Sequence, residues 1–211
     1  MTQLNEVTCD FCEEFASGIC AHWPELGRRI LYEDEDFCVF PGLGAFVKGY
    51  LLICSKAHVP SFAYLDEERI RRFQLVLSKT VGALTEAYRV PWLFEHGATY
   101  SRGRAGGCTE HAHVHLLPAS ANLDKVVQEK FQSVALSDWT ELSKWKDSPY
   151  LLVQTPTGDL LVSAVSENLP SQYLRRVAAD AVGRSEEWNW AVSFGEENIL
   201  STLNRLTSAF S

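Results

Sequence analysis

Three histidines alternate along one short segment of the chain, at positions 111, 113 and 115. In an extended strand, side chains two residues apart point to the same face, so His111, His113 and His115 are predicted to project together while Ala112 and Val114 pack into the core. Imidazole is a good nucleophile near neutral pH when one ring nitrogen is held protonated and the other faces a substrate. The pattern therefore predicts phosphoryl or nucleotidyl transfer through a covalent histidine adduct.

Two other interpretations of the three histidines stay open. They are polar residues on a solvated strand face, or they bind one metal ion, as three histidines do in some zinc enzymes. Neighbouring rings on one face of a strand lie about 6.5–7 Å apart, which is too far for three rings to converge well on one ion. For the covalent chemistry we expect the ring of His113 to be open to substrate and not bound to a metal.

The six cysteines of the chain fall into different classes. Cys38 and Cys54 lie within apolar runs and are interpreted as small core residues. Cys9 and Cys12 are separated by two residues, which is the spacing of a zinc-binding pair.

Short strands and one long helix are predicted to position these residues. Apolar residues at three-and-four spacing predict a helix over 66–89, with Asp66 as its N-cap and Pro91 just after its end. The strands predicted before residue 120 cover 29–33, 36–40, 47–54, a segment starting at Trp92, and 109–117. We therefore expect an α+β fold with a mostly antiparallel, five-stranded sheet and a long helix.

The composition changes after residue 120, which predicts a catalytic domain over 1–120 and a C-terminal α/β extension over 121–211 packed on it. Within the extension we expect a hairpin over 149–165 and helices over 171–182 and 198–206. Arg175 and Arg176 fall in the first turns of a helix, where basic residues are unfavourable unless an anion compensates them. They either face a phosphate or lie on a solvated helix face.

Composition excludes several classes of function. The 211 residues carry a net charge of −8, which argues against a nucleic-acid binder with a broad basic surface. No apolar run approaches the roughly 20 residues of a membrane span. The N-terminus lacks the basic start and apolar stretch of a secretory signal. We expect a cytoplasmic protein that binds neither nucleic acid nor membranes.

The segment 111–117 reads His-Ala-His-Val-His-Leu-Leu and resembles the motif of the histidine triad (HIT) family, His-x-His-x-His-x-x with apolar x positions. The segment 48–58, which ends in Ser-Lys-Ala-His, looks like the strand end that precedes the long helix in that family. The resemblance covers about residues 8–120 and implies a HIT-like fold for them.

The resemblance also implies roles for individual residues. His113 would be the nucleophile that forms a nucleotidyl-histidine intermediate, and His115 would donate hydrogen bonds to the phosphate oxygens. The backbone N–H groups of Gly106 and Gly107 would stabilise charge developing on those oxygens.

Other candidate substrate-binding residues flank this segment. Arg102 and Arg104 either clamp distal phosphates or solvate a loop. Cys108 stands where the family commonly has a serine that contacts the leaving group, and it is a weaker hydrogen-bond donor. Glu95 and His96, at a predicted strand end, either contact substrate or act as acid–base groups, or else are surface polar residues. Residues 40–44 also lack the Asp or Asn that holds the ribose hydroxyls in many members of the family, so these departures leave open whether the substrate is the usual adenosine nucleotide.

A structural zinc ion is implied as well, because several branches of the family hold one with a cysteine pair and two histidines. The matching ligands in this sequence are Cys9, Cys12, His58 and His111. A local site that uses Cys20 and His22 with the cysteine pair, and a chain without metal, are the alternatives.

The leading functional hypothesis is a hydrolase of nucleoside phosphoramidates, dinucleoside polyphosphates or similar nucleotide conjugates. The alternative is a nucleotidyltransferase or phosphorylase that uses the same histidine with a phosphate or sugar-phosphate acceptor, for which the extension offers room. A third hypothesis is a zinc-stabilised nucleotide-binding module without turnover. Members of the family are commonly dimers, which leaves a homodimer open for this chain.

Overall fold

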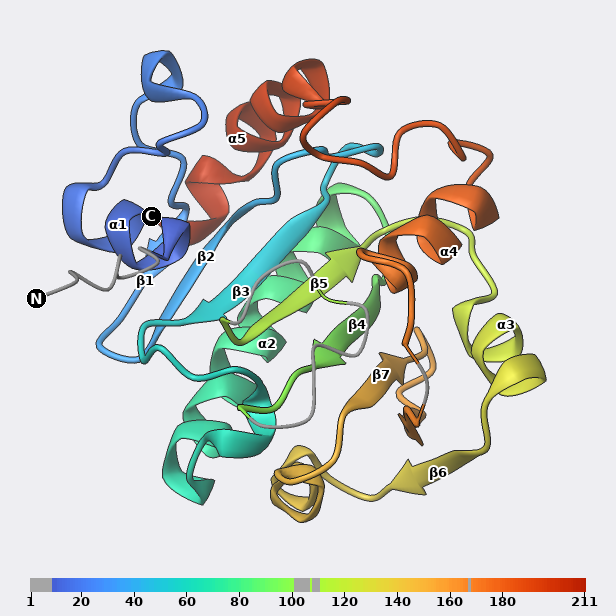
Figure 1. The fold of residues 1–211 in the computed structure, drawn as a ribbon. Helices are drawn as coiled ribbons and strands as arrows, with labels where there is room; N and C mark the ends of the chain where they lie inside the picture. The colour runs from blue at the N-terminus through green and yellow to red at the C-terminus, as the bar shows by residue number, and fades with distance from the viewer. Residues whose placement is uncertain (1–8, 101–106, 108–110, 167) are drawn as a thin grey trace, which may run out of the picture.

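The computed structural model describes residues 9–100, 107, 111–166 and 168–211, and its strands and helices form one layered unit (Figure 1). The strands are β1 (Tyr32–Glu33), β2 (Phe37–Pro41), β3 (Leu51–Ser55), β4 (Trp92–Gly97), β5 (His113–Leu117), β6 (Ser133–Leu136), β7 (Tyr150–Gln154) and β8 (Leu160–Ala164). The α-helices are α1 (Asp10–Ser17), α2 (Glu67–Ala87), α3 (Leu123–Lys130), α4 (Tyr173–Ala181) and α5 (Glu196–Phe210). Short 3₁₀ helices cover Pro24–Leu26, Phe62–Tyr64 and Trp139–Trp145.

The strands join in one sheet in the order β1-β2-β3-β5-β4-β7-β8-β6, and neighbouring strands are antiparallel. The α+β class is confirmed, but in the described residues the sheet has eight strands where we expected five. The reason is that β7 pairs with β4 along its whole length, from Leu93 opposite Gln154 to Gly97 opposite Tyr150. This pairing satisfies the backbone groups that β4 would otherwise present at a sheet edge.

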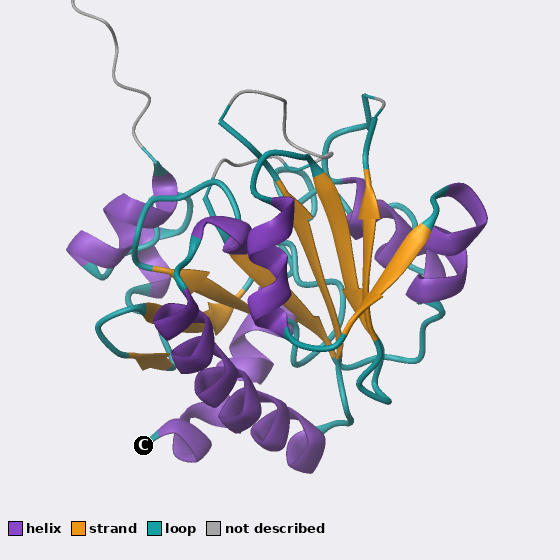
Figure 2. Cartoon of the chain, turned by 90° about the horizontal axis from the view of Figure 1, so that it is seen from below, coloured by secondary structure: helices purple, strands orange, loops and turns teal. Residues whose placement is uncertain are grey.

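Helices cover both faces of the sheet (Figure 2). On one face the main core contains the apolar side of α2, the 3₁₀ helix at Trp139–Trp145 and the end of α5. On the other face a second core contains α3, α4 and the start of α5. The segment after residue 120 therefore contributes to both layers and to the sheet itself.

Helix α2 forms where the three-and-four pattern predicts it. The side chain of Asp66 accepts a hydrogen bond from the backbone N–H of Arg69 at 2.8 Å, and Glu67 and Glu68 lie in the first turn. The apolar side chains of Ile70 and Phe73 are buried in the main core, which α2 shares with the sheet. Every helix among the described residues is too short or too polar to cross a lipid bilayer.

Several boundaries differ from the predictions. The strand predicted over 109–117 begins at His113, and β1 has two residues where 29–33 was predicted. Helices α1 and α3 and strand β6 were not predicted. Helix α1 has only eight residues, and long-range contacts hold it: Arg29 donates to Glu14 from two nitrogens, at 2.7 and 2.6 Å, in a buried ion pair. Local sequence patterns cannot predict such contacts, so they did not indicate this helix.

Candidate active site and metal centre

Strand β5 lies inside the sheet, between β3 and β4, and presents the histidines on one face. His113 lies opposite Cys54 of β3, while Val114 faces the main core on the other side of the sheet. The rings of His113 and His115 are 4.7 Å apart, closer than the spacing expected for a flat strand. The ring of Phe11 contacts both His111, at 5.5 Å, and His113, at 5.4 Å. The three rings therefore share a face, with His111 just before the strand.

The hydrogen bond made by His113 fixes which of its ring nitrogens carries hydrogen. Its Nδ1 lies 2.6 Å from the backbone carbonyl oxygen of His111. A carbonyl oxygen only accepts, so Nδ1 is the donor and the neutral ring has its lone pair on Nε2. Burial lowers the pKa of His113 to about 4, although this hydrogen bond opposes the shift. At neutral pH the ring is therefore uncharged, with Nε2 as its nucleophilic atom.

The exposure of His113 differs from our expectation of an open ring. Only 8% of the residue is exposed, because Phe11 of α1 packs edge-on against it and His115 lies beside it. His113 is not part of the group of metal-capable donors described below.

His115 is held from two sides. Its Nδ1 lies 2.8 Å from the hydroxyl oxygen of Tyr50, and its ring stacks on Phe94 with centroids 4.4 Å apart and planes 14° apart. Burial lowers the pKa of His115 well below its usual range, and the neighbouring His113 and Arg175 lower it further. The ring is therefore neutral and fixed in orientation.

His96 and Glu95, two neighbouring candidates on β4, point to opposite faces of the sheet. His96 lies on the face of His115, with ring centroids 6.2 Å apart, and its Nε2 accepts from the backbone N–H of Leu174 at 2.9 Å. It thus satisfies a backbone donor at the start of α4. Burial lowers the pKa of His96 to about 3, so the ring is neutral.

Glu95 faces the main core, where it accepts from the backbone N–H of Phe62 at 2.8 Å and from the hydroxyl of Tyr150 at 2.7 Å. Burial raises its pKa to about 7. The sheet separates this carboxyl from His113, so the geometry contradicts a contact between Glu95 and a substrate at His113. The alternative of a surface residue is also wrong, for Glu95 and His96 alike, because both are buried.

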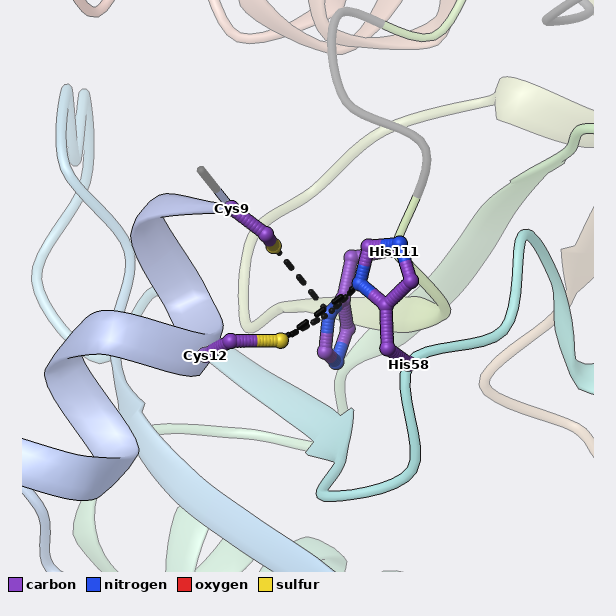
Figure 3. A group of neighbouring side chains, drawn as sticks. All are labelled: Cys9, Cys12, His58 and His111. Atoms are coloured by element: carbon purple, nitrogen blue, oxygen red, sulfur yellow. Dashed lines mark hydrogen bonds between the residues drawn. The ribbon is translucent and has the colours of Figure 1, made fainter. Parts of the chain in front are cut away.

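Four donors from three separate segments meet beside the histidine face (Figure 3). They are Cys9, Cys12, His58 and His111. Their donor atoms all lie within 4.8 Å of one another. The Sγ atom of Cys9 is 3.3 Å from Nδ1 of His111, and the Sγ atom of Cys12 is 3.4 Å from Nδ1 of His58. The two Nδ1 atoms are 3.3 Å apart.

These separations match donors that surround one tetrahedral ion. Zinc–nitrogen bonds of about 2.0–2.1 Å and zinc–sulfur bonds of about 2.3 Å place two nitrogens about 3.3 Å apart and a nitrogen and a sulfur about 3.6 Å apart. Nε2 of His111 donates to the backbone carbonyl oxygen of Ser55 at 2.6 Å, so Nδ1 presents a lone pair to the other three donors. The group therefore has the chemistry and the geometry of a closed, four-ligand metal site.

The local alternative with Cys20 and His22 is not assembled. Nε2 of His22 lies 2.9 Å from a carboxylate oxygen of Asp10, and Cys20 is buried. Neither belongs to the metal-capable group among the described residues.

Comparison with known proteins finds a family that part of the chain resembles. A family model described as the HIT domain matches residues 24–122. An uncharacterized HIT-like protein of Methanocaldococcus jannaschii is 27% identical over 121 residues, which are 57% of this chain and 89% of that protein. Over residues 24–122 this chain is similar to HIT-domain proteins.

Solved structures with likeness to the chain include a HIT family protein from Bacillus anthracis, at 23% identity and a TM-score of 0.44, covering 55% of this chain and 76% of that one. A zinc-bound histidine triad family protein from Mycobacterium smegmatis is 17% identical, with a TM-score of 0.40, and the match covers 65% of this chain and 88% of that one. Yeast Ap4A phosphorylase Apa2, in complex with AMP, is 14% identical with a TM-score of 0.43. The match covers 66% of this chain and 60% of that one.

The HIT match contains the three histidines of the triad and His58, but it does not contain all the residues that meet at the site. Cys9, Cys12 and helix α4 lie outside 24–122. The candidates Arg102, Arg104, Gly106 and Cys108 lie outside the described residues, and Gly107 is buried.

Sequence reasoning missed two residues beside the three histidines. Tyr50 lies within the segment 48–58 that carries the family resemblance, but its contact with His115 was not predicted. Arg175 was noted only as a basic residue near a helix start. It is buried, and it donates to Tyr50 and to the backbone carbonyl oxygen of Gly44, so it does not lie on a solvated helix face.

Proposed function

We propose that this protein is a nucleotide-conjugate hydrolase that acts through a covalent nucleotidyl-histidine intermediate on His113. The hydrogen bond from Nδ1 of His113 to the carbonyl of His111 carries the proposal, because it leaves the Nε2 lone pair for attack on phosphorus. The phosphoramidates, dinucleoside polyphosphates and similar conjugates that we propose as substrates all offer such a phosphorus atom next to a leaving group.

The reaction proceeds in two displacements. The Nε2 lone pair forms a bond to phosphorus, and the bond to the leaving group breaks with its electron pair going to that group. The imidazolium so formed is stabilised by the hydrogen bond from Nδ1 to the carbonyl of His111. Water then attacks phosphorus, loses a proton to solvent, and returns the bonding pair to Nε2. His115, 4.7 Å from His113 between ring centroids, lies close enough to contact a phosphate oxygen.

We also propose that Cys9, Cys12, His58 and His111 hold a structural zinc ion. The donor set and its separations support this assignment, as does the backbone acceptor that fixes the tautomer of His111. When bound, the ion supplies stability to the site and no catalytic water, because four protein ligands fill a tetrahedral shell. The site links α1 to the segment just before β5, so it also fixes Phe11 over His113.

A nucleotidyltransferase or phosphorylase is the second candidate, since it uses the same first displacement. The packing of α4 on the histidine face, through the hydrogen bond from Leu174 to His96, favours it, because a segment beyond the HIT match reaches the site. Here the acceptor is a phosphate or a sugar phosphate in place of water. A binding module without turnover is less well supported, because the hydrogen bond from Nδ1 of His113 leaves the lone pair on Nε2.

The test uses a panel of nucleoside 5′-phosphoramidates and dinucleoside tetraphosphates with different bases, incubated with and without orthophosphate. A hydrolase gives nucleoside monophosphate at the same rate in both, whereas a phosphorylase needs orthophosphate and gives the nucleoside diphosphate. His113→Ala is expected to reduce turnover on the order of 10⁴-fold or more, with far-UV circular dichroism and metal content unchanged.

His22→Ala is the matched control, because His22 is a partly exposed histidine outside the triad and outside the metal-capable group. It is expected to retain the activity of the wild type. Turnover by His113→Ala at the rate of the wild type would rule out His113 as the nucleophile.

A further inference from the structure

Arg175 of α4 is a buried cation on the histidine face of the sheet. Only 3% of the residue is exposed, and its guanidinium packs over the rings of Phe46, at 5.4 Å, and Tyr50, at 5.3 Å. Its Nε donates to the backbone carbonyl oxygen of Trp188 at 3.0 Å, and its Nη2 donates to that of Gly44 at 2.8 Å. These two contacts fix the plane of the guanidinium.

The remaining described hydrogen bond of this guanidinium leads to the active-site histidine. Nη1 of Arg175 donates to the hydroxyl oxygen of Tyr50 at 3.1 Å, and the same oxygen lies 2.8 Å from Nδ1 of His115. A guanidinium has no acceptor, so the hydroxyl oxygen must accept from it. With one lone pair taken by Arg175, the hydroxyl hydrogen is free to point to Nδ1 of His115, and in that arrangement the neutral ring accepts at Nδ1 and carries its own hydrogen on Nε2.

We propose that Arg175 and Tyr50 are positioning residues that hold His115 as the Nε2–H tautomer, so that this nitrogen donates a hydrogen bond to the phosphate under attack. The role in the reaction rests on the function proposed above. The two neighbouring rings then have complementary forms: His113 presents a lone pair at Nε2, and His115 presents a hydrogen at Nε2.

The surroundings of His115 support a fixed form of the ring. The stacked ring of Phe94, at 4.4 Å, blocks rotation out of plane. No carboxylate pairs with Arg175 within the part of the chain that the structure describes, so its positive charge is not neutralised there and disfavours a second proton on His115.

The contact also gives the C-terminal segment a part in the chemistry. Arg175 lies 125 residues from Tyr50 and outside the HIT match. The same helix donates a second hydrogen bond to this face, from the backbone N–H of Leu174 to Nε2 of His96 at 2.9 Å. Helix α4 is therefore bonded to His96 directly and linked to His115 through the hydroxyl of Tyr50.

The test is the tautomer of His115 in the full-length protein, measured by long-range proton–nitrogen correlation NMR on ¹⁵N-histidine-labelled samples without substrate. The variants are Tyr50→Phe and Arg175→Met. The control is Arg184→Met, which removes an exposed arginine that pairs with Glu187 on the surface. The wild type and the control are expected to show His115 as a single Nε2–H form, and both variants are expected to show a mixture or the Nδ1–H form.

Tyr50→Phe keeps the aromatic ring and all backbone contacts of Arg175, so it answers the question if Arg175→Met does not fold. A folded Tyr50→Phe protein with the tautomer of the wild type would overturn the proposal. So would a wild type in which His115 carries its hydrogen on Nδ1.

A kinetic arm separates this proposal from the proposed function, using the phosphoramidate that the wild type turns over fastest. Loss of the tautomer is expected to lower kcat about 10-fold or more while KM changes less, because the hydrogen bond strengthens as charge develops on the phosphate oxygen. Unchanged kcat in a variant with the altered tautomer would overturn the reaction role. An inert wild type would refute the proposed function, while the tautomer result still decides the positioning.

Discussion

Glu95 and His96, adjacent on β4, are ionizable residues that the sheet places in different environments. His96 contributes its ring to the histidine face, whereas Glu95 is buried in the main core between the N–H of Phe62 and the hydroxyl of Tyr150. Burial raises the pKa of Glu95 from 4.5 to about 7, so the folded protein retains its proton over a range in which the unfolded chain has lost it. The ionisation of this carboxyl is therefore linked to the stability of the fold.

The sign of this effect can be tested with Glu95→Gln. Between pH 4.5 and pH 7 the folded state binds more protons at Glu95 than the unfolded state does, so the stability that Glu95 contributes falls as pH rises and then stays constant. As pH rises across this range, the free energy of unfolding of the glutamine variant is expected to increase by roughly 3 kcal/mol relative to that of the wild type. Urea unfolding of both proteins at several pH values measures the difference, and a difference that does not change with pH would contradict the assigned burial.

The residue scale also shows which contacts a sequence can predict. The alternation of His111, His113 and His115 predicted their common face, because side-chain direction in a strand has a period of two. The role of Arg175 could not be predicted in this way, since its partner Tyr50 is 125 residues away and no local pattern joins them. The burial of His113 was not predicted for the same reason, because Phe11, which packs against it, belongs to a helix that is far away in the sequence.

At the scale of elements, α1 depends on its attachments. Eight residues are too few for a helix that is stable alone, and this one is held by the buried pair of Arg29 with Glu14 and by the metal-capable group at its start. With zinc in that group, Cys9→Ser is expected to lose the ion and to loosen α1, because three remaining ligands bind more weakly. Metal analysis and hydrogen exchange of the α1 amides measure the two effects.

Cys20→Ala is the matched control for that experiment, because Cys20 is another cysteine of the N-terminal region but lies outside the donor group. It is expected to keep one zinc ion per chain. Full zinc content in Cys9→Ser, or loss of zinc in Cys20→Ala, would refute the ligand assignment.

The junction of β4 and β7 is a second test at this scale. A Cβ atom on Gly97 would lie 2.2 Å from the ring of Tyr150, its partner across the two strands, so no larger residue fits without movement. Gly97→Ala is expected to destabilise the protein by about 1–3 kcal/mol, measured as a shift of the urea midpoint. Gly82→Ala, in the interior of α2 with open space around it, is the control and is expected to be neutral or stabilising. Equal stability of Gly97→Ala and the wild type would contradict this packing.

At the scale of the whole molecule, the segment after residue 120 shares one sheet and one core with the segment that matches the HIT domain model. Strand β7 covers the edge of β4, and Leu206 and Phe210 of α5 fill the main core. A fragment of residues 1–120 would expose that edge and remove those side chains. We expect it to aggregate or to lack cooperative unfolding, as measured by gel filtration and near-UV circular dichroism. A soluble fragment that unfolds cooperatively would show that residues 1–120 are an independent domain.

The fold was predictable where periodicity alone determines an element, as for α2 and for β2, β3, β7 and β8. It was not predictable where strand pairing decides the structure. We expected a sheet of five strands, but β7, from the other half of the chain, pairs with β4 and extends the sheet. The homodimer suggested by the family resemblance stays a prediction.

The nucleophilic role of His113 is the central claim, and a trapped intermediate tests it most directly. The wild type is mixed with the phosphoramidate that it turns over fastest, stopped within one turnover in alkali, where a phosphorus–nitrogen bond survives, and digested for mass spectrometry. We predict one nucleotidyl adduct, on His113, absent from His113→Ala and present in His22→Ala. An adduct on another residue, or turnover by the wild type with inversion at a chiral phosphorus and no adduct, would contradict the account.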